Sequence, residues 1–276
     1  SILYFAILGI LVLIVYNNYY YKGKQNAKNP VAKSQNAANL GVVNVYSSRK
    51  EIYIKPLFDL FTEQTGIKVN YVIDKAPKLI VRMEREGQLS DADVFLTSDI
   101  GNLALAKEKG LLLPVVSDEL VSNIPPFYRD PERHWFGFSK RVRAVFYAYD
   151  RVDPSELTTY GDLAAPKWQG KVLVRSSNNI YNQSLLAAMI VQYGRDYASQ
   201  WVKGLVANFA RKPQGGDTDQ LRALAAGQGD VAIANSYYYA RLFASKNDKD
   251  QDVANKIGIF FPDQKAHGAH VNISGG

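Results

Sequence analysis

GVVNVYSSRKEIYIKPLFDLFTEQTGIKVNYVI, residues 41–73, decides the fold class because it contains a complete strand–helix–strand unit. A short buried strand is predicted by the apolar residues Val42, Val43, Val45 and Tyr46. Residues 56–64 carry apolar side chains at helical spacing, and Gly66 ends that helix. Residues 68–73 have the β-branched alternation of a second strand. The order predicts a sheet with helical crossovers.

The same rhythm continues along the chain and predicts two lobes. A helix over 79–85, a strand over 93–97 and a helix over 100–109 complete a parallel α/β unit. After an extended stretch over 135–149 the pattern restarts, with predicted strands at 171–175 and 231–234 and helices at 184–193, 196–206 and 219–227. At 276 residues the chain exceeds one typical domain. We therefore expect an N-terminal lobe over 41–149, a C-terminal lobe over 150–260, and a segment over 261–276 that returns to the N-terminal lobe.

The first forty residues differ from this body. Residues 2–15 form an apolar run of signal-peptide length, and tyrosines and lysines follow it. We expect residues 1–24 to be a signal peptide or a membrane anchor, the anchor being formed by residues 2–21. Residues 25–40 are polar and without periodicity, so we expect a flexible linker. Cleavage and retention both stay open, and a buried core helix is the alternative reading.

Composition excludes several classes of site. The chain has no cysteine, so disulfides, zinc–thiolate sites and a lipid-anchored cysteine are all impossible. The net charge is +7, but the basic residues are scattered among 26 acidic ones, and we expect no nucleic-acid partner. Tyrosine is the unusual residue, with 18 copies.

Two polar segments follow predicted strands of the second lobe, where open α/β sheets bind ligands. Asn235-Ser236-Tyr237-Tyr238-Tyr239 could turn adjacent phenols into a crevice if the backbone kinks, or could be aromatic packing. The other segment, 175–184, leads into a helix whose free N–H groups could hold an anion beside Tyr181, or could simply be capped. Its candidate anion neighbours are Ser176, Ser177 and Asn178.

Other candidate residues lie outside these two segments. Arg49, Glu51 and Tyr53 follow the first strand, and Arg141 and Arg143 lie in the extended stretch. The remaining histidines suggest no site: His267 and His270 have a spacing that zinc could use but lack an evident third ligand, and His134 has no obvious partner.

A hard trivalent cation would unite these features. Fe(III) prefers anionic oxygen ligands, and a bound metal favours the deprotonated form of its ligands although free phenol has a pKa near 10. Two or three phenolates would nearly neutralise the iron, and an anion at the helix start could fill the remaining positions.

The chain, from about Val42 to its end, resembles the ferric-iron-binding periplasmic proteins, the substrate-binding components of iron(III) ABC transporters. The resemblance rests on these stretches taken together: Val45-Tyr46-Ser47-Ser48-Arg49, Ala92-Asp93-Val94-Phe95-Leu96-Thr97, Trp135-Phe136-Gly137, Arg141-Val142-Arg143, Arg175-Ser176-Ser177 with Tyr181-Asn182, Arg211-Lys212-Pro213-Gln214-Gly215-Gly216-Asp217, Asn235-Ser236-Tyr237-Tyr238-Tyr239 and His270-Val271-Asn272-Ile273-Ser274-Gly275. It implies a two-lobed, hinged type II periplasmic-binding-protein fold that closes over iron.

The resemblance also implies the metal ligands, which are Tyr181, Tyr237 and Tyr238, whereas Tyr239 packs or supports them. One departure concerns the N-terminal lobe. Many relatives place a histidine, or His-Tyr, after the first strand, but here Lys50 and Glu51 follow Arg49.

This departure leaves the contribution of the N-terminal lobe open. Either Tyr53 or Glu51 substitutes for the histidine, or the lobe supplies only Arg49 as a partner for an anion such as carbonate. Arg141 and Arg143 either balance phenolate charge or form structural ion pairs.

These expectations define a function. We expect a monomeric periplasmic or extracytoplasmic receptor, not an enzyme, that delivers Fe(III) to the permease of an ABC importer. Family members usually continue with helices beyond the stretch that ends here at Gly276, so we expect further sequence there. The alternatives are a binding protein for another anion or small organic ligand, an enzyme on a similar scaffold, and a membrane-anchored structural module.

Overall fold

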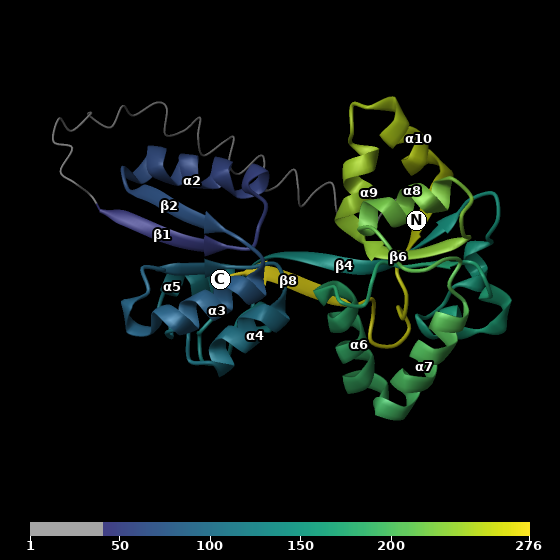
Figure 1. Ribbon diagram of the computed structural model, residues 1–276, viewed down its shortest axis with the longest axis horizontal. Helices are drawn as coiled ribbons and strands as arrows, with labels where there is room; N and C mark the ends of the chain where they lie inside the picture. The colour runs from purple at the N-terminus through teal and green to yellow at the C-terminus, as the bar shows by residue number, and fades with distance from the viewer. Residues whose placement is uncertain (1–40) are drawn as a thin grey trace.

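The computed structural model describes residues 41–276 and has two α/β lobes joined by two strands, β4 (Gly137–Ala148) and β8 (Val271–Gly275) (Figure 1). This architecture confirms the predicted two-lobed fold. The predictions for residues 1–24 and 25–40 lie outside the described residues. Within the described residues, none of the helices has the length and apolar character that a bilayer crossing needs.

The N-terminal lobe is built on a parallel three-stranded sheet. Its strands are β1 (Val42–Ser47), β2 (Lys68–Ile73) and β3 (Val94–Leu96), in the order β2-β1-β3. Helices accompany these strands: α2 (Glu51–Thr65), α3 (Ala76–Glu86), α4 (Ile100–Glu108) and the short α5 (Asp118–Asn123). The parallel sheet with crossover helices is therefore confirmed.

Helix α2 begins five residues earlier than the apolar periodicity predicted. Pro56 suits the first turn of a helix, and the sequence prediction placed the start there. Instead, Pro56 lies inside the helix and Ile54, 2% exposed, packs into the lobe. Glu51 and Tyr53 consequently lie in the first turn of α2 and not in a loop.

The C-terminal lobe has a mixed sheet in the order β5-β6-β4-β7. It comprises β5 (Val172–Leu173), β6 (Val231–Asn235), β7 (Ile257–Phe260) and the second half of β4, which runs antiparallel to β6 and β7. Helices α6 (Ile180–Tyr193) and α7 (Arg195–Ala207) cover one face. The other face is covered by α8 (Asp217–Ala225), α9 (Ser236–Phe243) and α10 (Asp248–Lys256) (Figure 1). The sequence prediction missed α5, α9, α10, β7 and β8.

Short 3-10 turns fill several connections. They span Gly87–Leu89, Pro126–Tyr128, Pro154–Glu156, Gly161–Ala164 and Pro166–Trp168.

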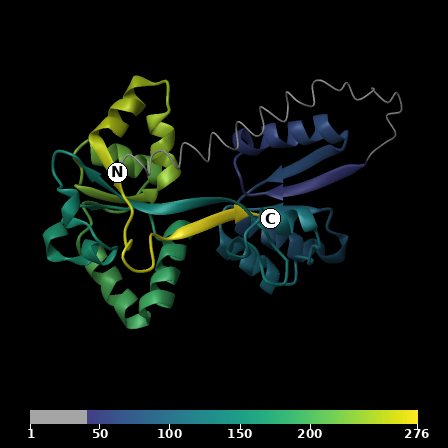
Figure 2. The same ribbon diagram turned by 180° about the vertical axis from the view of Figure 1, so that it is seen from behind.

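Strand β4 passes from one lobe to the other. Its first half, from Gly137 to Val142, pairs with β8, and its second half, from Arg143 to Tyr147, pairs with β6. Figure 2 shows the same two strands between the lobes from behind. Because β4 takes part in both lobes, Arg141 and Arg143 lie at the crossing. The predicted lobe limits at 149, 260 and 261 stay predictions.

Candidate metal centre

Tyr237 and Tyr238 lie in the first turn of α9, directly after strand β6. The sequence prediction had them on a kinked strand end, but the helix begins at Ser236. Their ring centroids are 4.1 Å apart with an interplanar angle of 30°. Tyr239, the third member of the run, turns into the core, where its ring lies 5.6 Å from that of Phe146. The run therefore divides into a packed tyrosine and an adjacent stacked pair.

Tyr181 belongs to the first turn of α6, which also starts earlier than predicted. Its backbone N–H donates to Oδ1 of the N-cap residue Asn179, 3.0 Å away. Two guanidinium groups lie over its ring, with the Cζ atoms of Arg141 and Arg175 at 4.9 and 5.5 Å from the centroid. Such cations are attracted to the negative face of the ring.

The structure brings the three tyrosines together. The hydroxyl of Tyr237 interacts with those of both Tyr181 and Tyr238. Burial, and then the charge that Tyr181 would carry, raise the pKa of Tyr237 far above that of free phenol and the pKa of Tyr238 to about 12. Ionisation of Tyr237 and Tyr238 is therefore unfavourable without a cation, and a multivalent cation beside them would stabilise their phenolates.

A buried carboxylate joins the helices that carry these tyrosines. Asp217, at the start of α8, accepts hydrogen bonds from Arg143 Nη1 at 2.5 Å, Arg175 Nη1 at 3.2 Å and the backbone N–H of Asn235 at 2.8 Å. Arg143 Nη2 also donates to Asn182 Oδ1 in α6, at 2.6 Å. Asp217 therefore fixes the start of α9 directly and the start of α6 through two arginines.

Arg141 forms a second buried ion pair. Its Nη2 lies 2.6 Å from Oδ2 of Asp99, the N-cap residue of α4, and Ser184 Oγ in α6 donates to Oδ1 of the same carboxylate at 2.8 Å. Arg141 Nη1 donates to the carbonyl of Ile273 at 2.7 Å. Both arginines of the extended stretch thus form structural ion pairs, and Arg141 in addition contacts the ring of Tyr181.

The three candidate site residues of the N-terminal lobe, Arg49, Glu51 and Tyr53, each contact a different partner. Arg49 Nη1 donates to Ser274 Oγ at 2.7 Å, and Arg141 Nη1 shares that oxygen at 3.3 Å, so Arg49 reaches the neighbourhood of the tyrosine cluster. Glu51 instead accepts from the hydroxyl of Tyr71 at 2.6 Å on its own lobe. Tyr53 lies under Arg241 of α9. None of these contacts joins Glu51 or Tyr53 to the three tyrosines.

The loop before α6 is a capped helix start. Ser176 Oγ accepts from the N–H of Asn178 at 3.4 Å, and the carbonyl of Ser177 accepts from Gln183 at 3.1 Å. Ser177 and Asn178 are exposed. The contacts of this loop are local, which matches the reading of a helix cap.

Sequence reasoning assigned no role to His270, yet it borders the same site. Together with Tyr181, Arg141, Arg143 and Asn235 it lines a small pocket at the strand crossing. Burial, and then the charges of the two arginines, lower the pKa of its imidazole to about 4. His267, three residues earlier, packs edge-on against Tyr193 at 5.4 Å. The sequence signals that could have found it were its spacing to His267 and its place at the start of a stretch that carries the family resemblance.

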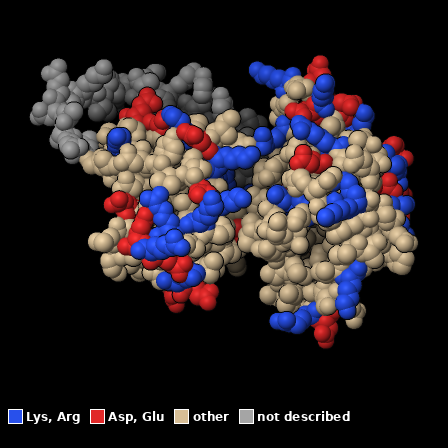
Figure 3. Space-filling view, viewed as in Figure 1, with Lys and Arg blue, Asp and Glu red and all other residues tan. Residues whose placement is uncertain are grey.

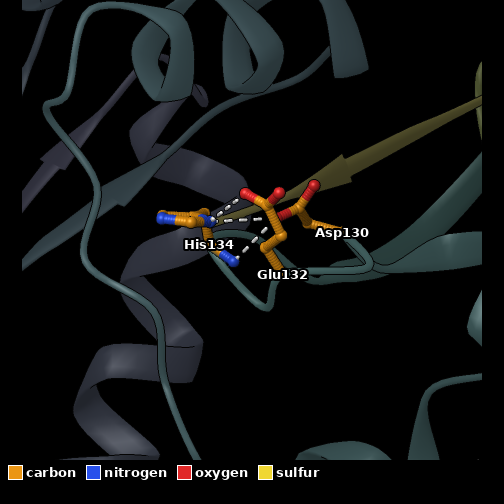
Figure 4. Close-up of side chains that lie close together, drawn as sticks. All are labelled: Asp130, Glu132 and His134. Atoms are coloured by element: carbon orange, nitrogen blue, oxygen red, sulfur yellow. Dashed lines mark hydrogen bonds and ion pairs between the residues drawn. The ribbon is translucent and has the colours of Figure 1, made fainter.

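A separate cluster, Asp130, Glu132 and His134, lies in the N-terminal lobe (Figure 4). His134 Nδ1 is 3.0 Å from Asp130 Oδ2, so the expectation that His134 lacks a partner was wrong. Lys107 Nζ forms ion pairs with both acids, at 2.8 Å from Asp130 and 2.9 Å from Glu132. This arrangement is an ion-pair network that ties α4 to the loop before β4.

Comparison with known proteins gives the family. Residues 90–271 match the bacterial extracellular solute-binding proteins. The chain is 46% identical over 233 residues to iron uptake protein A1 of Synechocystis, covering 84% of this chain and 65% of that protein. It thus spans about two thirds of the length of this curated relative.

Comparison with solved structures also gives similar proteins named for iron or ferric binding. A Trichodesmium protein (IdiA, FutA) in complex with iron and citrate has 53% identity and a TM-score of 0.80, covering 85% of this chain and 74% of that one. The ferric binding protein of Campylobacter jejuni has 43% identity and a TM-score of 0.81, covering 84% and 74%. The chain therefore belongs to the family of bacterial extracellular solute-binding proteins.

Proposed function

We propose that this protein is an extracytoplasmic iron(III) receptor that delivers ferric ion to an ABC importer. The observation that carries the proposal is the convergence of Tyr181, Tyr237 and Tyr238, from two different helices, with their hydroxyls in contact range. Similarity to proteins named for iron uptake and ferric binding supports the same cargo.

Each phenolate would neutralise one positive charge of Fe(III). The raised pKa values of Tyr237 and Tyr238 mean that these groups are protonated at neutral pH before iron arrives. Iron binding therefore releases protons, and acidification favours iron release. Arg175 and Arg141, which lie over the ring of Tyr181, add positive charge beside the proposed ligands.

The arginines around the three tyrosines outnumber the carboxylates that pair with them, which favours a bound anion. Arg143 and Arg175 share the single carboxylate of Asp217, while Arg141 is paired with Asp99. Arg49 adds another positive charge next to Arg141, held only by the neutral hydroxyl of Ser274 among its described contacts. A small carboxylate or carbonate bound with the metal would offset this excess and complete the coordination of the ion.

The remaining steps follow from the two-lobed shape. The tyrosines belong to the C-terminal lobe, so ferric ion binds there first, and hinge motion at β4 and β8 brings up the N-terminal lobe. The closed monomer then docks on a permease, without catalysing a reaction. On the face shown in Figure 3, basic and acidic side chains are interspersed over both lobes, which supports the absence of a nucleic-acid partner.

Colour tests this function. Ferric phenolate absorbs visible light and gives a red-orange solution, and we expect that colour when ferric citrate is added to the metal-free protein. Tyr237→Phe combined with Tyr238→Phe should abolish it, while Tyr239→Phe, a change of the same kind on the same helix, should retain it. Full colour in the double variant would overturn the ligand assignment. Absence of colour in the unmodified protein would favour an aromatic pocket for another anion or an organic ligand.

A further inference from the structure

Two side chains connect the lobes away from the strand crossing. Tyr53 belongs to α2 in the N-terminal lobe and Arg241 to α9 in the C-terminal lobe. The guanidinium carbon of Arg241 lies 5.3 Å from the centroid of the Tyr53 ring. Helices α2 and α9 lie on the same side of β4, whereas α4 and α6 lie on the other (Figures 1 and 2). The contact therefore spans the gap between the lobes on the α2–α9 side.

Arg241 is also close to the candidate ligands along its own helix. It follows Tyr237 by four residues and Tyr238 by three, and residues at these spacings share one side of an α-helix. A contact at Arg241 thus fixes the N-terminal lobe to the same turns of α9 that present the tyrosines.

We propose that Tyr53 and Arg241 form a latch between the lobes, which favours the closed form and slows the loss of bound ferric ion. The claim about loss of ferric ion rests on the proposed function, whereas the claim about lobe closure is independent of it. Tyr53 is 39% exposed, so the cation–π contact has the modest strength of a partly solvated pair. We expect it to raise the ratio of closed to open protein about two- to five-fold.

Substitutions at Tyr53 distinguish the contribution of its aromatic ring from that of its hydroxyl. The face of a phenylalanine ring attracts a guanidinium group, so Tyr53→Phe keeps the latch, whereas Tyr53→Leu has no π face and removes it. Arg241→Gln removes the cation. Arg241 also interacts with the carboxylate of Asp250 on its own lobe, so the Tyr53 variants isolate the contact between lobes.

The test measures the distance between lobes in the whole chain. Because the protein has no cysteine, Gln64→Cys in α2 and Lys249→Cys in α10, both exposed, accept two spin labels without interference. Double electron–electron resonance on metal-free protein then gives the closed-to-open ratio. We expect a two- to five-fold fall for Tyr53→Leu and for Arg241→Gln, the same fall for the two together, and the parental ratio for Tyr53→Phe.

Two results would overturn the latch: a parental ratio in Tyr53→Leu, or a double variant whose fall is the product of the single falls. Transfer of iron to a chelator, followed by loss of colour, should accelerate by the same factor in Tyr53→Leu, and Ile52→Ala, 74% exposed on the same helix turn, serves as control. If ferric citrate gives no colour with any variant, the proposed function is wrong, while the metal-free distances still decide whether the latch exists.

Discussion

The two sides of the gap between the lobes are built differently. On the C-terminal side, three tyrosines lie at the starts of α6 and α9, and buried ion pairs at Asp217 fix both helices. On the N-terminal side, the candidates are the partly exposed Arg49 and the exposed Glu51 and Tyr53, each with a different partner. One side is a preorganised set of candidate oxygen ligands, and the other is a set of separate surface groups. Under the proposed function we therefore expect the C-terminal lobe to hold the metal and the N-terminal lobe to cover it.

The strongest test of this difference between the lobes is to change one oxygen-bearing side chain in each lobe. Tyr181→Phe should weaken ferric binding by more than about a hundred-fold, because it removes a ligand and not merely a supporting group. Glu51→Gln should leave the affinity unchanged, since that carboxylate bonds with Tyr71. Competition with citrate, followed by visible absorbance, measures both. Equal losses in the two variants would mean that the metal lies between the lobes and binds ligands from each.

A second change tests whether the support beneath the tyrosines matters. Asp217→Asn leaves Arg143, which is 1% exposed, without a counter-charge and should lower the free energy of unfolding by about 3–5 kcal/mol. In protein that still folds, ferric affinity should fall about ten- to a hundred-fold because α6 and α9 lose their common anchor. Asp219→Asn, an exposed cap in the same helix turn, should cost about 1 kcal/mol and leave the affinity intact. Urea unfolding and citrate competition distinguish the two variants.

We expect a smaller effect, on the pH dependence of folding stability, from His270, which lies where the lobes meet. Folding lowers its pKa from 6.5 to about 4, so the unfolded chain binds the proton first as the pH falls. The stabilisation is complete above pH 6.5 and is lost as the pH drops through 4. Between pH 7 and pH 5 the metal-free protein should lose about 2 kcal/mol that His270→Gln does not lose. Urea unfolding of the two proteins at both pH values measures the difference.

Local sequence patterns predicted many of the helices and strands but not where helices α2 and α9 begin. Strands β1 and β2 and helix α4 follow from periodicity, because each has a repeating apolar pattern and a clear stop. Helix α2 was started too late because Pro56 looked like a first-turn residue, and only the packing of Ile54 shows otherwise. The tyrosine run was assigned to a strand end because it directly follows the predicted strand at 231–234. The structure shows instead that Asn235 is the N-cap residue of α9, although its side chain makes no capping hydrogen bond.

The candidate site depended on information that is not local. The family resemblance implied Tyr181, Tyr237 and Tyr238, whereas residue pattern alone favoured aromatic packing for the tyrosine run and a plain capped helix at Tyr181. The partners of the arginines were beyond sequence reasoning because Arg143 and Asp217 are 74 residues apart and Arg141 and Asp99 are 42 apart. The turn of Glu51 toward Tyr71 likewise depends on how β2 pairs with β1.

Locating the iron tests the account most directly. Crystals of the protein loaded with ferric citrate, measured on both sides of the iron absorption edge, give an anomalous signal at the metal alone. The account predicts one strong site bonded to the hydroxyl oxygens of Tyr181, Tyr237 and Tyr238, with no oxygen of Glu51 or Tyr53 bound to it. An ion held elsewhere, for example at Asp130 and His134, or without tyrosine oxygens, would contradict it.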